Sequence, residues 1–233
     1  MKKFSLLFIL LLSFQSNAQF GGVFGKDPII NLENFDEQRV YWGYFLGFNS
    51  LDFKIDQNIP TDEILVNSTT GFNVGLVGDL RLYDYINLRF EPGLYYTQRD
   101  LTFPGFDNKF DALRQVKSTY IFFPLLLKFS SVRTGNIRPF LVGGVSTAIN
   151  LSSNAKSTDD NSNNRFRMNQ WTNYYEVGFG IDFYLEYFKF SPSIRGVFGL
   201  NDELIRDNDP NSPYTSTVDA MQTRGIFINF TFH

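Results

Sequence analysis

The sequence contains no cysteine and a single histidine, His233, which is the last of its 233 residues. Without cysteine there is no disulfide, no thiolate-bound metal and no lipid-modified cysteine to anchor the chain. A single histidine supports neither a Ser-His-Asp triad nor a histidine-rich metal site. We therefore expect no catalytic residues, no metal site and no cofactor, and we expect that the protein is not an enzyme.

Charge and long apolar runs are also scarce. Charged residues make up 19% of the chain and the net charge is −3, so no basic surface is available and we expect no nucleic-acid partner. After the first residues, the most apolar run is Tyr120–Leu127, which is short and contains Pro124. A membrane-spanning helix needs about 20 apolar residues. The sequence therefore predicts no transmembrane helix.

The first 18 residues have the pattern of a secretory signal peptide. Lys2 and Lys3 give the positive start, residues 4–14 the apolar centre, and Ser16-Asn17-Ala18 a small-x-small cleavage site. Cleavage there leaves about 215 residues, which suits one domain. Residues 19–38, rich in glycine and polar residues, are expected to form a periplasmic N-terminal segment before a barrel over residues 39–233.

What the chain has in abundance is alternation of period two. From Val40, every second residue is apolar or aromatic, and the residues between are glycine, polar or charged, which indicates strands with two unlike faces. Eight segments show the pattern: Arg39–Asn49 with a continuation through Ile55, Thr69–Leu82, Ile86–Gln98, Thr119–Ser130, Ile137–Asn150, Trp171–Phe183, Phe188–Leu200 and Ile226–Phe232.

The connections between these segments alternate strictly in length. Tyr83–Tyr85, residues 132–136 and Glu186-Tyr187 are short, whereas the links 51–68, 100–116, 151–170 and 201–222 are long. This alternation is typical of outer-membrane barrels with tight periplasmic turns and longer external loops. The sequence predicts an all-β fold, an eight-stranded antiparallel up-and-down transmembrane β-barrel with both termini in the periplasm.

Alternation alone does not say which face points inward, and a lipocalin-like barrel with an apolar lumen is the alternative. The polar face is rich in glycine, which suits a narrow packed interior: Gly43, Gly47, Gly71, Gly75, Gly178 and Gly180. The apolar face carries aromatic residues near strand ends, where interfacial girdles belong: Trp42, Tyr44, Tyr96, Trp171 and Tyr175. The closing segment ends with penultimate Phe232, the kind of aromatic that barrel-assembly machinery reads. These features favour the membrane orientation.

The inward face is expected to hold a network of paired charges: Arg81, Arg89, Lys189, Arg195, Asp79, Glu91, Glu176 and Asp182. The turn at Tyr83–Tyr85 places Asp79 opposite Arg89, and the turn at Glu186-Tyr187 places Arg195 opposite Gly178, within reach of Glu176. An eight-stranded barrel has room for its own side chains and little else. We therefore expect the lumen to be filled, and the function to lie in the loops, the N-terminal segment or the lipid-facing wall.

Two acidic clusters occupy the long links. Asp159-Asp160 lies within Ser152–Asn164, and Asp207-Asn208-Asp209 lies within Asp207–Pro213. Both surroundings are rich in Ser, Asn, Asp and Pro, and neither matches a complete calcium-binding loop, so we expect flexible, solvated loops. The link 201–222 is likewise expected to be polar, with Tyr214 and Met221 within it.

Several stretches resemble a known family. The stretch Tyr41-Trp42-Gly43-Tyr44-Phe45-Leu46-Gly47-Phe48-Asn49, followed by Leu51-Asp52-Phe53-Lys54-Ile55, resembles the opening strand of PorT proteins. Residues 88–96, 123–128 and 138–144 resemble the wider family of PorT-like small barrels. The resemblance implies an outer-membrane protein linked to type IX secretion and, in gliding bacteria, to motility. It brings no catalytic residues with it.

From these observations we expect a non-enzymatic outer-membrane barrel of a Gram-negative bacterium, acting in type IX protein secretion as an accessory or assembly component. The alternative is a small barrel like OmpA or OmpX that binds at the surface or stabilises the membrane. The expected partners are outer-membrane lipid, the β-barrel assembly machinery and components of type IX secretion.

Overall fold

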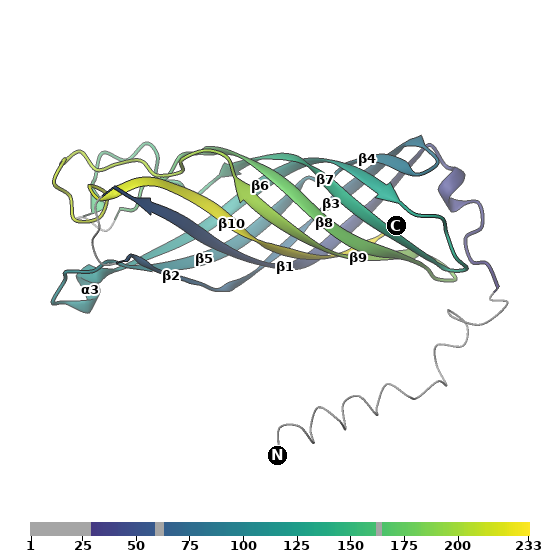
Figure 1. The fold of residues 1–233 in the computed structure, drawn as a ribbon, viewed down its shortest axis with the longest axis horizontal. Helices are drawn as coiled ribbons and strands as arrows, with labels where there is room; N and C mark the ends of the chain where they lie inside the picture. The colour runs from purple at the N-terminus through teal and green to yellow at the C-terminus, as the bar shows by residue number, and fades with distance from the viewer. Residues whose placement is uncertain (1–28, 59–62, 162–164) are drawn as a thin grey trace, which may run out of the picture.

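The computed structural model describes residues 29–58, 63–161 and 165–233, which form a closed ring of antiparallel strands (Figure 1). The ring closes because β1 (Val40–Gln57) pairs with β10 (Val218–Phe232) on one side and with β3 (Thr70–Tyr83) on the other. Closure pairs the backbone groups along these ladders, which a lipid environment requires of a spanning sheet. The expected signal peptide, residues 1–18, and residues 19–28 of the expected N-terminal segment lie outside the described residues.

Eight antiparallel strands make up the ring, as the sequence predicts. Two of them are each interrupted once, so β2 with β3, and β4 with β5, count as one strand apiece. The other bounds are β2 Leu65–Ser68, β4 Ile86–Phe90, β5 Gly93–Thr102, β6 Leu113–Ser130, β7 Ile137–Asn150, β8 Trp171–Tyr184 and β9 Lys189–Gly199. Two short helices accompany them in the part of the chain that the structure describes, the 3₁₀ helix η1 (Phe35–Glu37) and α3 (Lys109–Ala112). Among the described residues, no helix is long and apolar enough to cross a membrane.

Proline explains the interruption between β4 and β5. Pro92 has no N–H to donate to a neighbouring strand, so the ladder pauses at Glu91-Pro92. The backbone remains satisfied around the break, since the N–H of Leu76 donates to the carbonyl of Pro92 at 2.9 Å and the N–H of Glu91 to that of Pro124 at 3.2 Å. The expected segment Ile86–Gln98 is therefore two strand pieces in one position of the ring.

Several strands run further than the sequence predicts, and the expected long links are correspondingly shorter. β1 continues to Gln57 and β5 to Thr102, while β6 begins at Leu113 and β10 at Val218. The expected links 51–68, 100–116 and 201–222 thus shrink to residues 58–64, 103–112 and 200–217. Most outward side chains of these extensions are polar, Gln115 and Lys117 on β6 for example, so the apolar alternation that marks a strand fades there.

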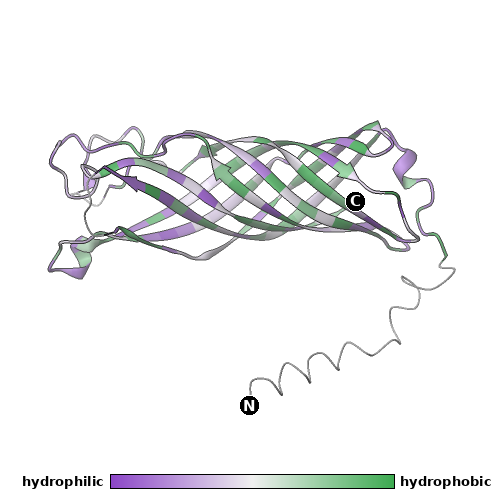
Figure 2. Ribbon diagram, in the orientation of Figure 1, coloured by the Kyte–Doolittle hydropathy of each residue, from purple (hydrophilic) through white to green (hydrophobic). Residues whose placement is uncertain are grey.

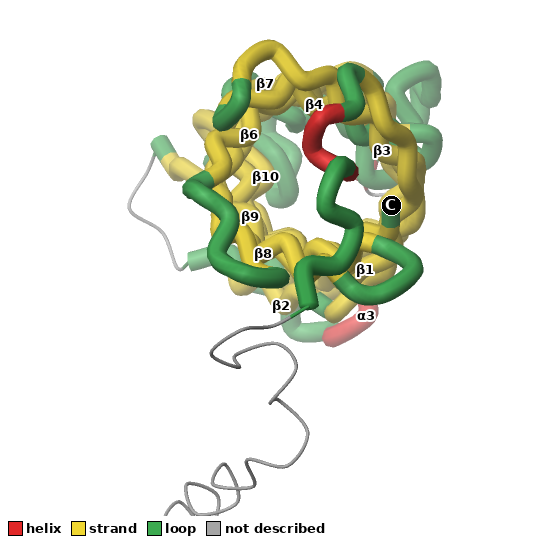
Figure 3. The backbone as a smooth tube through the Cα atoms, turned by 90° about the vertical axis from the view of Figure 1, so that its right-hand side faces the viewer, coloured by secondary structure: helices red, strands yellow, loops and turns green. Residues whose placement is uncertain are grey.

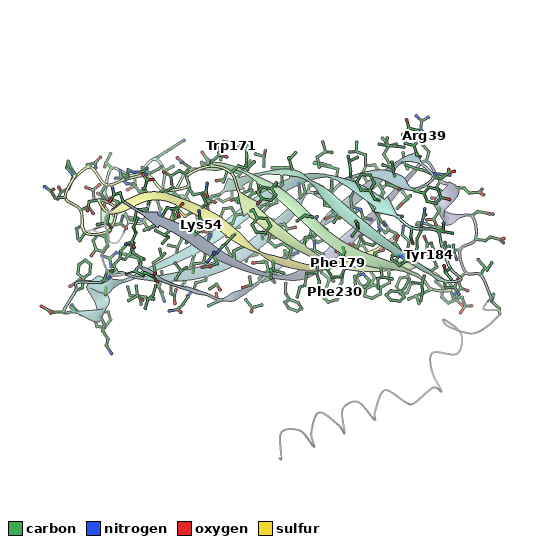
Figure 4. All side chains as sticks on the ribbon, viewed as in Figure 1. Arg39, Lys54, Trp171, Phe179, Tyr184 and Phe230 are labelled. Atoms are coloured by element: carbon green, nitrogen blue, oxygen red, sulfur yellow. The ribbon has the colours of Figure 1, made fainter. Side chains whose placement is uncertain are left out.

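The choice of faces is confirmed by exposure. The expected lipid face is outside, with Trp42 73%, Leu76 63% and Phe179 57% exposed. Asn73 and Asp79, on the opposite face of β3, are 1% and 0% exposed. Figure 2 shows hydrophobic residues along the strands, and Figure 4 shows Phe179 and Phe230 on the outer wall. The lipocalin-like orientation is therefore ruled out, because its outer wall would be polar.

Outward apolar side chains form a zone around the ring, and we call this zone the apolar belt. On β1 it includes Val40, Trp42, Tyr44, Leu46 and Phe48, each at least 46% exposed. Beyond Phe48 the outward residues of β1 become polar, starting with Ser50. The end of the ring that carries the short connections is called the turn end below, and the opposite end the loop end.

The belt generates a first prediction. Val177 lies near the middle of β8 and is 56% exposed within the belt, whereas Ser50 lies beyond it on β1. Val177→Arg is expected to destabilise the folded protein in lipid vesicles by about 2–4 kcal/mol, because arginine near the bilayer midplane loses its hydration. Ser50→Arg is expected to cost about 0–1 kcal/mol near the interface. Urea unfolding of both variants in the same vesicles measures the difference, and equal costs would contradict the placement of the belt.

Candidate functional surfaces

The middle of the ring is filled by an aromatic layer. Tyr95, Phe122 and Phe227 meet there, with ring centroids 4.7 Å apart for Tyr95 and Phe122 and 4.6 Å apart for Tyr95 and Phe227. Tyr174 packs on Phe122 at 5.1 Å, and Phe45 on Tyr95 at 6.2 Å. All five side chains are 0% exposed. The alternation indicates a polar inner face and does not reveal this layer, although Phe45 and Phe122 occupy inward positions.

Glycines make room for this layer. A Cβ atom on Gly75 would lie 2.5 Å from the ring of Phe45, and one on Gly93 would lie 2.7 Å from the same ring. At Gly180, a Cβ would lie 2.4 Å from the ring of Phe140. Large inward rings on one strand therefore require glycine on strands one or two positions away in the ring, which is a more specific reason for the glycine-rich face than a generally narrow interior.

A chain of buried charges lies on the turn-end side of the aromatic layer. Arg89 donates to both carboxylate oxygens of Asp79, at 3.1 and 2.8 Å, and to Glu91 at 3.2 Å. Arg195 continues the chain, 2.8 Å from Glu91 and 3.3 Å from Glu176. Asp79 is the cross-strand partner of Arg89 and Gly178 that of Arg195, so both registers inferred from the turns are confirmed.

A second buried pair supplements this chain, and one expected member is absent. Lys128 donates to Asp182 at 2.6 and 2.9 Å, and the Ser191 hydroxyl donates to the same carboxylate at 2.6 Å. Arg81 was expected inside but pairs at the rim with Asp84, which follows β3 in the turn. Arg81 lies next to the turn, where the ring opens to solvent, and it therefore escapes burial.

Residues 29–38 lie across the turn end of the ring. Figure 3 shows η1 and the segment before it over the opening. Asp36 accepts from the Tyr184 hydroxyl at 2.6 Å and pairs with Arg138 at 3.0 Å. Arg133, in the turn between β6 and β7, donates to the carbonyl of Leu32 at 3.1 Å. The described part of the expected N-terminal segment is thus bound to the barrel and covers its opening.

Lys189 and His233 are buried beneath this cover. The Lys189 ammonium lies 4.2 Å from the centre of the Tyr41 ring and 4.6 Å from that of Phe35 in η1, so two rings stabilise the charge by cation–π contact. The His233 ring packs edge-on against Tyr41 at 5.1 Å. Both side chains are 0% exposed, which places the single histidine inside the molecule and away from any solvent-accessible substrate.

The connections at the loop end pack into a second apolar cluster, which we call the loop cap. It joins strand extensions to loop residues, and its members are Phe53, Leu101, Phe103, Val116, Phe166, Met168, Leu204, Tyr214, Val218 and Met221. Arg114 on β6 links two loops to the barrel, because it donates to the Tyr214 hydroxyl at 2.5 Å and to the carbonyl of Asn161 at 3.0 Å. Tyr214 and Met221, expected in a polar loop, are 5% and 1% exposed.

The loop cap corrects the expectation of flexible loops at the two acidic clusters. Asp160 and Asp207 are brought together by Arg167, which lies 2.8 Å from Asp160 and 3.7 Å from Asp207. Asn208 donates its backbone N–H to Asp160 at 2.9 Å, linking the two loops directly. Arg167 thus offsets part of the negative charge of the acidic pair. Among the described residues, no group of three or more His, Asp or Glu side chains could hold a metal ion.

Arg99 and Glu203 separate the loop cap from the aromatic layer. The Arg99 guanidinium stacks 3.8 Å over the Phe53 ring and donates to Tyr120 at 2.6 Å and to Thr223 at 2.8 Å. Glu203, from the connection between β9 and β10, accepts the N–H of Thr223 at 3.0 Å. Burial raises the pKa of the Glu203 carboxyl, and nearby Arg99 lowers it in part. The interior is therefore filled from the turn end to the loop end.

The comparisons agree with this architecture. A family model described as an outer membrane protein beta-barrel domain matches residues 15–204. The chain belongs to this family of outer-membrane β-barrels. Its location in the outer membrane follows from that membership and from the exposed apolar belt. No curated protein matches the chain.

Solved structures similar to this chain include OprG from Pseudomonas aeruginosa, with 15% sequence identity, 83% of this chain and 94% of that chain covered, and a TM-score of 0.44. The solid-state NMR structure of AlkL in lipid bilayers has 11% identity, covers 89% of this chain and 93% of that chain, and has a TM-score of 0.41. The structure of Ail, the attachment invasion locus protein of Yersinia pestis, has 10% identity, covers 82% of this chain and 96% of that chain, and has a TM-score of 0.34.

The buried charge chain generates a second prediction. Asp79→Asn is expected to destabilise the folded barrel by about 3–5 kcal/mol, because it leaves Arg89 buried without its main partner. A double-mutant cycle with Arg89→Met is expected to show strong coupling, since the double variant removes the charge that would be left unpaired. The free energies of unfolding of the wild type, the two single variants and the double variant, measured in vesicles, give the coupling energy.

An exposed pair provides the matched control for that cycle. Arg224 and Asp52 also face each other across two strands, at 2.9 Å, but their side chains are 54% and 32% exposed. Coupling for Asp52→Asn with Arg224→Met is expected to be about 0–1 kcal/mol. Similar coupling energies in both cycles would show that the lumen pair is not buried as described.

Proposed function

We propose that this chain is a non-enzymatic outer-membrane protein that acts through its surfaces, as an accessory or assembly component of type IX secretion. Action through the surfaces is supported by the filled interior, in which the aromatic layer lies between the charge chain and the loop cap. A barrel filled at three levels is not a conduit for a polypeptide. The resemblance of residues 41–55 to the opening strand of PorT proteins supports the role in type IX secretion.

The proposed orientation places the turn end in the periplasm. Residues 29–38 and His233 both lie at the turn end, where Phe35 and His233 have ring centroids 6.4 Å apart. A periplasmic turn end leaves both termini on the side from which a secreted chain arrives and places the loop cap outside the cell. The partners in this proposal are outer-membrane lipid, the barrel-assembly machinery during insertion, and secretion components at the exposed ends.

A second candidate is a surface-binding or membrane-stabilising module. The observation that favours it is the loop cap, whose own apolar cluster and Arg167 ion pairs hold the loops in one arrangement. Ordered loops present a fixed surface to a partner, which lowers the entropy cost of binding. This function would not require any secretion system.

Deletion of the protein from its own bacterium separates the two candidates. The secretion proposal expects type IX cargo to disappear from the medium and unprocessed precursor to accumulate in the periplasm. Restoring the wild-type chain is expected to return the cargo. Normal cargo secretion in a clean deletion would contradict the secretion role and favour the surface module.

Complementation with surface variants then tests which end acts. Phe110 in α3 at the loop end and Tyr187 at the turn end are matched in exposure, at 85% and 83%. Neither Phe110→Ser nor Tyr187→Ser is expected to change barrel abundance, and we expect at least one of them to reduce cargo secretion. A conservative interior change, Thr97→Ser, is expected to leave secretion intact. Loss of secretion with Thr97→Ser at normal barrel abundance would contradict action through the surfaces.

A further inference from the structure

A lysine just beyond the apolar belt lacks the neutralising partner that its counterparts have. Three cations point outward from the described strands beyond the loop-end edge of the belt: Lys54, Lys117 and Arg224. Lys54 pairs with Asp56 at 2.9 Å, and Arg224 pairs with Asp52 at 2.9 Å. Lys117 on β6 is exposed and forms no ion pair with any residue that the structure describes. Its charge is therefore available to a ligand.

Two adjoining cavities meet at Lys117. One, of about 350 Å³, extends toward the belt past Thr70, Phe72, Tyr96 and Thr119. The other, of about 480 Å³, extends toward α3 and the loop cap and includes Phe110, Asn154 and Phe166. Both cavities are lined by Lys117 and by Ser152, so they form one groove along the outer wall.

The groove has the chemistry of an amphiphile site. At its belt end, Phe72 and Tyr96 stack with centroids 4.7 Å apart and are 52% and 41% exposed. Thr119 is the cross-strand partner of Tyr96, and Lys117 lies two residues further toward the loop end. Two residues of a strand span about 7 Å, so Lys117 lies that far from the level of Tyr96. Thr70, Thr119 and Ser152, which carry hydroxyl groups, line the space between the aromatic pair and the loops. The apolar end of the groove, next to the belt, matches a lipid acyl chain. The cationic end at Lys117 matches an anionic headgroup.

The neighbouring carboxylate does not neutralise this site. Asp100, on the adjacent strand β5, accepts a hydrogen bond from the side chain of Gln98 at 3.0 Å. Gln98 is the cross-strand partner of Lys117, so this bond holds Asp100 on the strand next to the lysine without an ion pair between them. A phosphate is the anionic group that a lysine ammonium binds readily as a point charge.

We propose that the groove around Lys117 binds the phosphate-bearing headgroup of a membrane lipid, with an acyl chain lying against Phe72 and Tyr96. Lys117 holds the phosphate, and the hydroxyls of Thr119 and Ser152 donate to its remaining oxygens. The site adds a lipid-recognition role to a barrel whose interior is filled, and it does not depend on the secretion proposal.

The test uses the full folded protein in a neutral detergent, titrated with phosphatidic acid and followed by native mass spectrometry. Wild-type protein is expected to bind one phosphatidic acid about fivefold more tightly than Lys117→Gln, the scale of one lysine near an anionic lipid. Lys54→Gln is the matched control, since Lys54 is also exposed beyond the belt but is already paired, and it is expected to bind as wild type.

Two further arms identify the source of the phosphate. Diacylglycerol with the same chains is expected to bind no more tightly to wild type than to Lys117→Gln, and millimolar inorganic phosphate is expected not to displace phosphatidic acid. Equal affinities for wild type and Lys117→Gln would overturn the site, as would an equal loss with Lys54→Gln. Displacement by inorganic phosphate would overturn the lipid assignment in favour of free phosphate. Both variants change exposed side chains, and retention of the heat-sensitive folded band on gels confirms that they are folded.

Discussion

The structure depends on how a ring of eight strands fills its own interior. A ring of this size leaves a lumen about as wide as the side chains that point into it, and a void there would cost dispersion and hydrophobic energy. The chain solves this with large aromatic rings at mid-height, set against glycines on neighbouring strands, as Phe45 lies against Gly75 and Gly93. The aromatic ring fills the space that the missing glycine side chain leaves, so a larger residue at the glycine would require a smaller one at the ring position.

The layers on either side follow from that central one. Toward the turn end, the charges of Asp79, Arg89 and Glu91 are far from water, and each requires an opposite charge nearby. Toward the loop end, the strands extend beyond the belt and their inward apolar residues need a cover, which the loops provide as the loop cap. With the middle filled, the surfaces open to a partner are the outer wall, the loop cap and the covered turn end.

The sequence predicts the features that repeat along the chain. The choice of faces needed the glycines of the polar face and the aromatic residues of the apolar face, whereas the alternation and the short turns were sufficient for the number of strands, the bounds of β7 and the pairing of Asp79 with Arg89. These features are local, because a tight turn fixes the register of the two strands it joins. The expected family was right at the level of outer-membrane barrels, while the role in type IX secretion stays a proposal.

The features that the sequence did not predict depend on contacts between distant segments. The loop cap brings Asp160 and Asp207 to Arg167, a pairing that no local pattern encodes. Residues 29–38 look like a polar tail until Arg138 and Tyr184, more than 100 residues away, provide partners for Asp36. Inward rings such as Tyr95 and Phe227 were overlooked because an outward and an inward aromatic are alike in a one-dimensional pattern.

The central claim is that the interior is closed, and the ion conductance of the purified wild-type protein in a planar lipid bilayer tests it most directly. The account predicts no steady current steps, because the aromatic layer of Tyr95, Phe122 and Phe227 leaves no continuous water path. Long-lived current steps of constant size from the folded wild-type protein would contradict it.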